Sequence, residues 1–239
     1  MTGFHNIHWP RAFADGFAII VSILLAFGIQ AWWEERQERR IEHEELTRLL
    51  DEFSSNRDLI QRNMLETSFR RRIEASSLNV SNVLDTAIQE GREFAPVSNR
   101  DLSNILQYPT LELETPVFDS LVRSGRIEII EDTDIIISIR NWDGRYRNAN
   151  ESERDSRQFA VNHFFPAIAE VNDIQHILVG RRTRGAIDFG ATTMIRANRK
   201  LANTIAERYY WIELSSDQWS DLQERTDHVI ETISRFLNQ

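Results

Sequence analysis

The histidines of this chain are the first residues to consider for chemistry. His43 and Glu44 begin the sequence His-Glu-Glu-Leu-Thr, which starts like the zinc-protease pattern His-Glu-x-x-His, but Thr47 stands where the second zinc ligand is needed. His5 and His8 lie three residues apart, and we interpret them as interface residues of an N-terminal tail rather than as metal ligands. The remaining histidines that we considered are too far apart in the sequence to indicate a shared site: His163, His176 and His228. The histidine pattern therefore predicts no metal site.

The arginines offer a candidate anion contact. Arg181, Arg182 and Arg184 lie between Gly180 and Gly185, and guanidinium groups match the geometry of phosphate and carboxylate. The segment lacks the Gly-Lys-Ser/Thr ending of a nucleotide-binding loop, so a solvated loop or pairing with acidic surface groups is the alternative. We interpret a second run, Arg70-Arg71-Arg72, as the solvent-facing side of an amphipathic helix.

Other patterns that support catalysis are missing. The chain has no cysteine, which excludes disulfides and thiolate chemistry. Glu131, Asp132 and Asp134 are acidic neighbours, but a helix start explains them, because side-chain oxygens there accept backbone N–H groups. No catalytic residue and no cofactor is predicted. An enzyme whose site forms only through tertiary contacts remains one alternative.

A long apolar run near the N-terminus, Phe13 to Trp33, decides how the elements are organised. As a helix with a rise of about 1.5 Å per residue it would be about 30 Å long, which matches the hydrocarbon thickness of a bilayer. Trp9, Trp32 and Trp33 lie at both ends, as interface anchors do. A cleaved signal peptide would be shorter and more basic at its start, and a buried helix would not normally carry these flanks. We therefore predict a transmembrane helix over residues 12–33, after a tail over residues 1–11.

One face of this helix is a candidate partner face. Ala18, Ser22 and Ala26 recur every fourth residue, and Gln30 continues the same line. Small residues at this spacing allow two helices to approach closely, and a glutamine can hydrogen-bond across the contact. The alternative is that alanine and serine are common in any membrane helix.

The charges next to the apolar run bear on topology. Arg36, Arg39 and Arg40 follow the run, whereas Arg11 precedes it, and this bias favours a cytoplasmic soluble part. Long domains also cross membranes irrespective of that bias, so the periplasmic side is the alternative.

The remainder, residues 34–239, is predicted to be a soluble bundle of long antiparallel helices. Of all residues, 27% are charged and the formal net charge is −9, which argues against a nucleic-acid-binding protein. We expect one long helix from residue 34, or two helices joined near residues 74–79. Local signals predict the later helices. A short one is expected at 101–107, and the next runs from Pro116, with Thr115 as its cap, to a stop at Gly125. Another runs from Asp132 toward Phe165, where Pro166 is expected either to end it or to kink it, and the last one covers 191–237.

These residues bring out a resemblance. An aromatic pair followed by acidic residues and arginines (AWWEERQERR), then a long polar helix, then T-x-x-x-x-L-x-x-S-G-x-I-x-I-I over Thr115 to Ile130, resembles a broad, largely uncharacterised bacterial family of single-pass membrane proteins. The resemblance implies a helical domain anchored in the bacterial inner membrane, and it supplies no catalytic residues.

Three classes of function follow from these patterns. The first is a membrane-anchored helical scaffold or accessory subunit without catalysis, which contacts the lipid bilayer and forms a homo-oligomer or binds a protein partner. The second is a sensor or ligand-binding module with a polar pocket lined by Trp142, Tyr146, Tyr210 or Trp211. The third is an enzyme with a cleft of clustered titratable groups. We predict the first.

Overall fold

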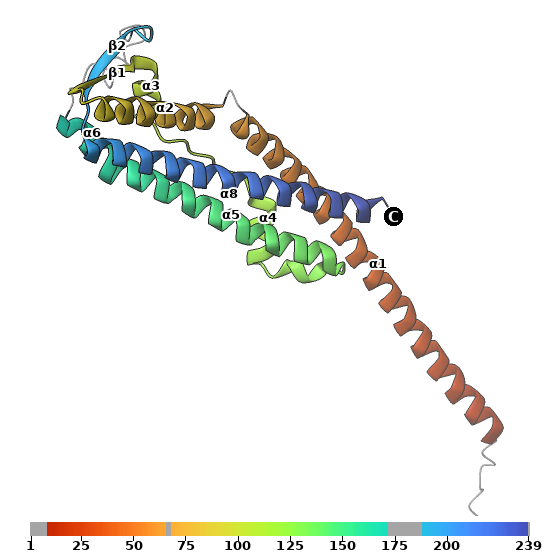
Figure 1. Cartoon of the computed structure of the whole chain (residues 1–239). Helices are drawn as coiled ribbons and strands as arrows, with labels where there is room; N and C mark the ends of the chain where they lie inside the picture. Colours follow the sequence, from red (N-terminus) through yellow and green to blue (C-terminus); the bar gives the residue numbers. More distant parts are fainter. Residues whose placement is uncertain (1–8, 66–67, 172–187, 239) are drawn as a thin grey trace, which may run out of the picture.

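A computed structural model describes residues 9–65, 68–171 and 188–238, without the side chains of residues 9–16, 18, 19 and 171. The chain is mainly helical and its principal helices are long, as predicted (Figure 1). In chain order the elements are α1 (Trp9–Met64), α2 (Phe69–Gln89), β1 (Phe94–Ser98), α3 (Asn99–Ile105), α4 (Pro116–Arg123), the 3-10 helix η1 (Arg126–Ile129), α5 (Thr133–Phe159), the π-helix η2 (Ala160–Phe164), α6 (Phe165–Val171), β2 (Thr192–Arg196) and α8 (Arg199–Leu237).

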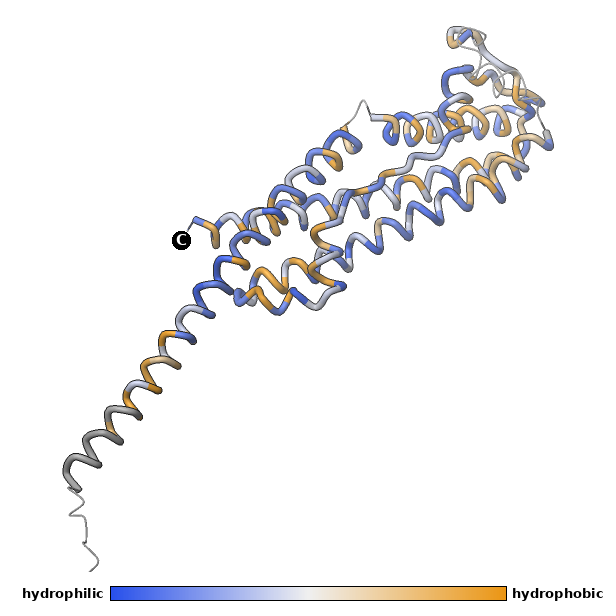
Figure 2. The backbone as a smooth tube through the Cα atoms, turned by 180° about the vertical axis from the view of Figure 1, so that it is seen from behind, coloured by the Kyte–Doolittle hydropathy of each residue, from blue (hydrophilic) through white to orange (hydrophobic). Residues whose placement is uncertain are grey.

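Helix α1 divides into a projecting half and a packed half. Residues 34–40 are exposed, and packing begins at Ile41 and Glu42, of which Glu42 is only 3% exposed. The N-terminal half extends away from the other helices as a single rod (Figure 1). Its apolar stretch is followed by a strongly hydrophilic one before the bundle is reached (Figure 2). In the part of the chain that the structure describes, no helix is both long and apolar enough to cross a membrane.

Helix α8 is the axis of the bundle. The packed half of α1 and then α2 lie end to end along one of its sides, and α5 runs antiparallel to it along another (Figure 1). The break between α1 and α2 falls before Ser68, whose hydroxyl accepts the backbone N–H of Arg71 at 3.3 Å and caps α2. The predicted joint near residues 74–79 is therefore wrong. Residues 74–79 lie inside α2, where the hydroxyl of Ser77 donates to the carbonyl of Ile73 at 2.8 Å.

The predicted helix boundaries at Pro116, Gly125 and Asp132 are confirmed. Pro116 is the first residue of α4, and Gly125 follows its C-terminal end with φ of 73°, a conformation that glycine adopts without strain. The Asp132 carboxylate accepts the backbone N–H groups of Asp134 at 2.8 Å and Ile135 at 3.0 Å, which caps α5. Local sequence signals suffice at these positions, since each joins residues close together in the chain.

The last predicted helix begins later than expected. Residues 192–196 form strand β2, which pairs with β1 in a two-stranded antiparallel sheet, and α8 starts only at Arg199. Thr193 and Ile195 are β-branched, and Ile195 is buried at 1% exposure against the end of the bundle. Asn198 then caps α8 by accepting the backbone N–H of Leu201 at 2.8 Å. The sequence prediction missed this sheet because its two strands are nearly a hundred residues apart.

Near Pro166 the helix that begins at Asp132 is distorted but does not end, so of the two predicted outcomes the helix end is wrong. After α5, one π-helical turn over Ala160–Phe164 leads into α6, and Phe165 donates its N–H to the carbonyl of Ala160, five residues earlier. Pro166 lies near the start of α6 and does not end it. Because the π-turn contains one extra residue, the side chains after it face α8 in a different register from the side chains before it.

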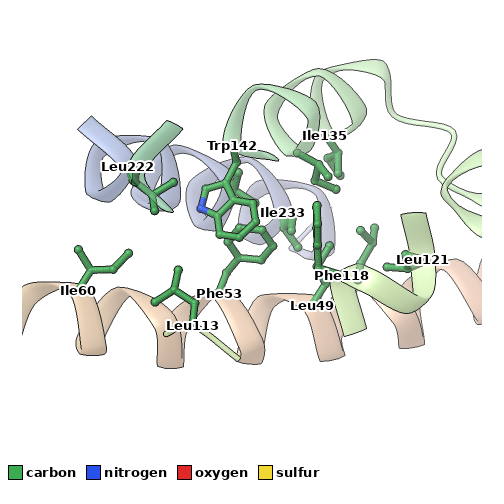
Figure 3. Close-up of a cluster of buried hydrophobic side chains, with 14 of the residues drawn as sticks. Leu49, Phe53, Ile60, Leu113, Phe118, Leu121, Ile135, Trp142, Leu222 and Ile233 are labelled. Atoms are coloured by element: carbon green, nitrogen blue, oxygen red, sulfur yellow. The ribbon is translucent and has the colours of Figure 1, made fainter. Parts of the chain in front are cut away.

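Two apolar clusters fill the bundle. The first gathers α1, α4, α5 and α8 around Trp142, which meets the ring of Phe53 edge-on at a centroid distance of 4.8 Å (Figure 3). The second joins α2, α3, the sheet, α6 and the start of α8 around Phe164 and Ile205. Both Trp142 and Phe164 are fully buried, so each cluster is a closed core.

Candidate functional site

The projecting half of α1 carries the largest run of exposed apolar side chains among the described residues. Phe17 is 69% exposed, Leu24 is 64% exposed and Phe27 is 65% exposed, and neighbouring apolar residues are similarly open. Soluble monomers rarely expose continuous apolar patches of this size, and such patches usually mark contact with a protein or a membrane. This segment is therefore the first candidate functional surface.

The polar end of this segment is organised by contacts within α1 and with the loop before α5. The Arg36 guanidinium lies 5.6 Å from the ring centroid of Trp32, and Trp33 beside it is 62% exposed. Arg39 pairs with Glu35 at 3.1 Å and with Glu131 at 3.6 Å. The hydrogen bond from Arg39 to Glu35, helped by the charge of Glu131, raises the pKa of the Arg39 guanidinium. Aromatic and charged groups thus follow the apolar side chains directly.

The predicted partner face on α1 is only partly described. Ser22, Ala26 and Gln30 are exposed, whereas the side chain of Ala18 lies outside the described part of the chain. Gln30 donates its side-chain amide to the Glu34 carboxylate at 2.9 Å, so one of its hydrogen-bonding groups is used within the helix. Trp9 belongs to α1, and its side chain is likewise outside the description.

The other predicted sites either lie outside the described residues or have members on separate helices. Arg181, Arg182 and Arg184 fall within residues 172–187, outside the described residues, as do His5, His8 and His176. His43 and His228 are exposed on different helices. Among the described residues, no group of three or more histidine, aspartate or glutamate side chains is placed to hold a metal ion.

One arginine of the Arg70-Arg71-Arg72 run is not on the solvent-facing side, which corrects the sequence interpretation. Arg70 is only 1% exposed, forms an ion pair with Glu153 of α5, and donates through Nη1 to Ser215 Oγ of α8 at 2.8 Å. Burial lowers the pKa of Arg70, and the Glu153 carboxylate opposes this effect. The arrangement ties three helices together between the two apolar clusters.

Glu153 is the centre of this buried polar layer. Its carboxylate also accepts the indole N–H of Trp219 at 2.9 Å and the backbone N–H of Leu111 at 2.8 Å. Every contact of Glu153 satisfies a buried donor, which indicates a structural role rather than a free acid or base. The sequence gives no sign of this role, since Leu111 and Trp219 are 42 and 66 residues away from it.

The aromatic residues predicted to line a pocket separate into two groups. Trp142 is fully buried, donates its indole N–H to Thr226 Oγ1 at 2.9 Å and stacks on Tyr146 at 5.0 Å, so this region is packed core. Tyr210 is exposed at 54%. Trp211 lines a surface hollow between α5, η2 and α6 on one side and α8 on the other. The hollow is the second candidate site.

This hollow has a volume of about 600 Å³. It is lined by carboxylates, aromatic rings and small polar groups: Asp155, Gln158, Phe159, Asn162, His163, Pro166, Ala167, Glu170, Lys200, Thr204, Glu207 and Trp211. Asn162 and His163 belong to the π-helix, so the irregular turn supplies part of the wall. Such turns occur frequently at functional sites.

Comparison with known proteins identifies no relative of this chain. No known protein family, curated protein or solved structure matches the chain.

Proposed function

We propose that this protein is a membrane-anchored helical scaffold, held in the bacterial inner membrane by residues 12–33 and acting through helix contacts with copies of itself or with a larger membrane complex. The observation that carries the proposal is the contrast within α1. One half of the helix packs its apolar face into the bundle, whereas the other half exposes Leu24, Leu25 and Phe27 by 60% or more. Lipid would cover these side chains and remove their apolar surface from water.

The residues that follow the apolar segment suit a position at a membrane surface. Trp32 and Trp33 are amphipathic rings of the kind enriched at the boundary between lipid and water. Arg36 lies over Trp32, and residues 34–40 expose their side chains. At about 1.5 Å per residue, these seven residues would hold the packed bundle about 10 Å above the boundary. The basic residues after the span favour the cytoplasmic side for the bundle.

The experiment is fractionation of the full-length protein from bacterial membranes, followed by alkaline carbonate extraction. The native chain is expected in the membrane pellet. Leu24→Arg with Leu25→Arg should move it to the supernatant, because each arginine at a helix centre disfavours insertion by about 2.5–3.5 kcal/mol. Ile137→Arg is the matched control, since Ile137 is an apolar residue of α5 that is 51% exposed. If the native protein stays in the supernatant with its N-terminus intact, that result contradicts the proposal.

Scaffolding through the small-residue face has its own test. Ala18→Leu, Ser22→Leu and Ala26→Leu together should block close helix approach, and the detergent-solubilised protein should become smaller by light scattering. Ala31→Leu makes one change of the same kind about 100° away from Gln30 on the helix and should leave the particle size unchanged. An unchanged size and unchanged co-purifying proteins in the triple variant would argue against this face.

A further inference from the structure

The part of α1 that follows the apolar segment sorts its charges onto two sides of the helix. We call this part, residues 33–45, the neck. Glu42 and Glu45 are three residues apart, so they share one side. That side faces the bundle, because the Glu42 carboxylate accepts the backbone N–H of Glu131 at 2.9 Å and Glu45 pairs with Arg126. These carboxylates of the neck are therefore used in holding α1 against the bundle.

The opposite side of the neck carries an aromatic ring and basic groups. Trp33, Arg36 and Arg40 are three and four residues apart, so they lie on one face. Arg40 is turned about 200° around the helix from Glu42. Trp33 is 62% exposed, and the side chain of Arg40 is 72% exposed. Together with His43 they line a surface hollow of about 620 Å³, which we call the outer face of the neck.

Two guanidinium groups of the outer face are incompletely paired within the chain. Arg36 lies over the ring of Trp32 and has no ion-pair partner in the part of the chain that the structure describes. Arg40 pairs with Glu44 at 4.0 Å, which is longer than the about 2.7–2.9 Å of a charge-assisted hydrogen bond. Arg39, at the edge of the hollow, differs because it pairs with two carboxylates. Arg36 and Arg40 can thus take an anionic partner.

The direction of the side chains places this partner near the apolar segment. Side chains of an α-helix lean toward its N-terminus, and the apolar segment is N-terminal to the neck. Arg36 shows this lean, since its guanidinium lies 5.6 Å from the ring of Trp32, one turn earlier. Arg40 is about 10 Å beyond Trp33 along the helix, and its long stem allows the guanidinium to lie closer. Headgroups extend about 5–8 Å from the hydrocarbon, so both groups can reach them.

The same face of a second copy is a poor partner. Parallel packing of two necks through their outer faces would place Arg36 and Arg40 against their own counterparts, and like charges repel. A phosphate group instead offers a guanidinium two acceptor oxygens in matching geometry. The exposed ring of Trp33 suits the boundary between lipid and water on the same side of the helix. Charge and position together favour a lipid headgroup.

We propose that the outer face of the neck binds the headgroups of anionic phospholipids. Arg36 and Arg40 pair with the phosphate groups, while Trp33 lies at the boundary with the hydrocarbon. The inference rests on the proposed anchoring of residues 12–33 in a membrane, and it adds the class of lipid that gathers around the neck.

The test is tryptophan quenching in vesicles that contain the full-length protein, neutral phosphatidylcholine and anionic phosphatidylglycerol, with brominated acyl chains on one lipid or the other. Trp9→Phe is introduced throughout, so that Trp32 and Trp33 are the indoles nearest to the lipid. The ratio of anionic to neutral lipid at these indoles is expected to be about fivefold the ratio in the vesicle. That factor corresponds to about 1 kcal/mol, the contribution of one basic residue at an anionic surface.

Variants separate the outer face from the charge of the whole protein. Arg36→Gln with Arg40→Gln should bring the lipid ratio close to that of the vesicle. Arg92→Gln with Arg196→Gln is the matched control, because it removes the same charge from exposed positions beside the sheet, at the far end of the bundle (Figure 1). The control should keep the enrichment, and both variants should keep the circular dichroism spectrum.

The possible failures of the lipid inference and of the anchor differ. Quenching by each lipid in proportion to its share of the vesicle would overturn the inference and leave the anchor in place. Enrichment that persists in Arg36→Gln with Arg40→Gln, or that is lost equally in the control, would also overturn it. If neither brominated lipid quenches Trp32 and Trp33, both the inference and the anchoring are wrong.

Discussion

At the scale of single residues, the buried ion pair between Arg70 and Glu153 decides how α2, α5 and α8 fit together. It lies between two apolar clusters and joins positions 83 residues apart. Apolar contacts alone would allow one helix to slide along another. A buried charge, in contrast, is stable only where its ion-pair partner lies within reach. We infer that this polar layer fixes the register of the three helices.

The first prediction concerns removal of one partner. Arg70→Leu should lower the free energy of unfolding by about 3–5 kcal/mol, because it leaves the Glu153 carboxylate buried without its cation. Urea unfolding of the full chain, followed by circular dichroism, measures the change. Arg123→Leu is the control, since its ion pair with Asp119 is exposed and should contribute less than about 1 kcal/mol. Equal effects of the two changes would contradict the role of the buried pair.

Glu52 is a second residue that acts across a long stretch of chain. Its carboxylate accepts the backbone N–H groups of Val117 at 2.7 Å and Phe118 at 2.9 Å, and so caps α4 from another helix. Thr115, the predicted cap, makes no such bond to the backbone and instead donates its hydroxyl to Asp119 at 3.3 Å. Partial burial raises the pKa of Glu52 above its ordinary 4.5, although the two backbone donors oppose the shift.

The pH dependence of stability follows from that direction. A carboxyl whose pKa is higher in the folded state favours folding while it is protonated, and this contribution is lost as the pH rises through the folded pKa. The native protein should therefore lose stability relative to Glu52→Gln as the pH rises from below the ordinary glutamate pKa of 4.5 toward neutrality. The measurement is the difference in unfolding free energy between the two proteins across that range. A native protein that gains stability over Glu52→Gln as the pH rises would contradict the burial argument.

At the scale of elements, local signals in the sequence predicted the helices whose ends depend on nearby residues. Asp132 and Gly125 act on backbone groups within three residues, so their effect can be read from a short segment. The start of α8 depends instead on strand pairing between Ala95 and Ile195 and between their neighbours. Helical spacing of apolar residues continued through β2, and the prediction extended the helix through it.

Two glycines allow a matched test of element ends and interiors. Gly125 has φ of 73° at the end of α4, where alanine is strained by about 1–2 kcal/mol, so Gly125→Ala should lower the unfolding free energy by that amount. Gly144 lies inside α5 with open space where the methyl group of an alanine would stand, so Gly144→Ala should raise it by about 0.4–1 kcal/mol. Thermal unfolding of both variants gives the two signs. A stabilising Gly125→Ala would contradict the left-handed turn.

At the scale of the whole molecule, α1 joins a projecting segment to a packed one through residues 34–40, which make few contacts outside α1. Residues 34–40 are exposed, while Leu46 and Leu49 a few turns later are fully buried. A break in the exposed part should therefore leave the bundle unaffected, and a break in the packed part should not.

Proline substitutions test this separation. Gln37→Pro should disrupt α1 locally and change the unfolding free energy of the bundle by less than about 0.5 kcal/mol. Ser54→Pro, in the packed half, should lower it by about 3 kcal/mol or more, because an interior proline removes a helix hydrogen bond and clashes with the preceding turn. Hydrogen exchange of the amides in α5 and α8 reports the bundle alone. Loss of their protection in Gln37→Pro would show that the two halves of α1 are not independent.

By itself, the sequence determined the helical class, the long helices, the cap at Asp132, the stop at Gly125, and an apolar segment ahead of a charged one, because each depends on residues within a few turns of one another. Only the tertiary structure decided that Arg70 is buried, that Glu52 caps α4, that two distant strands pair, and that Asp155 and Glu207 line one hollow. These contacts join side chains from about 50 to more than 100 residues apart. Their geometry arises only when α1, α2, α5 and α8 have packed, so no local pattern encodes it.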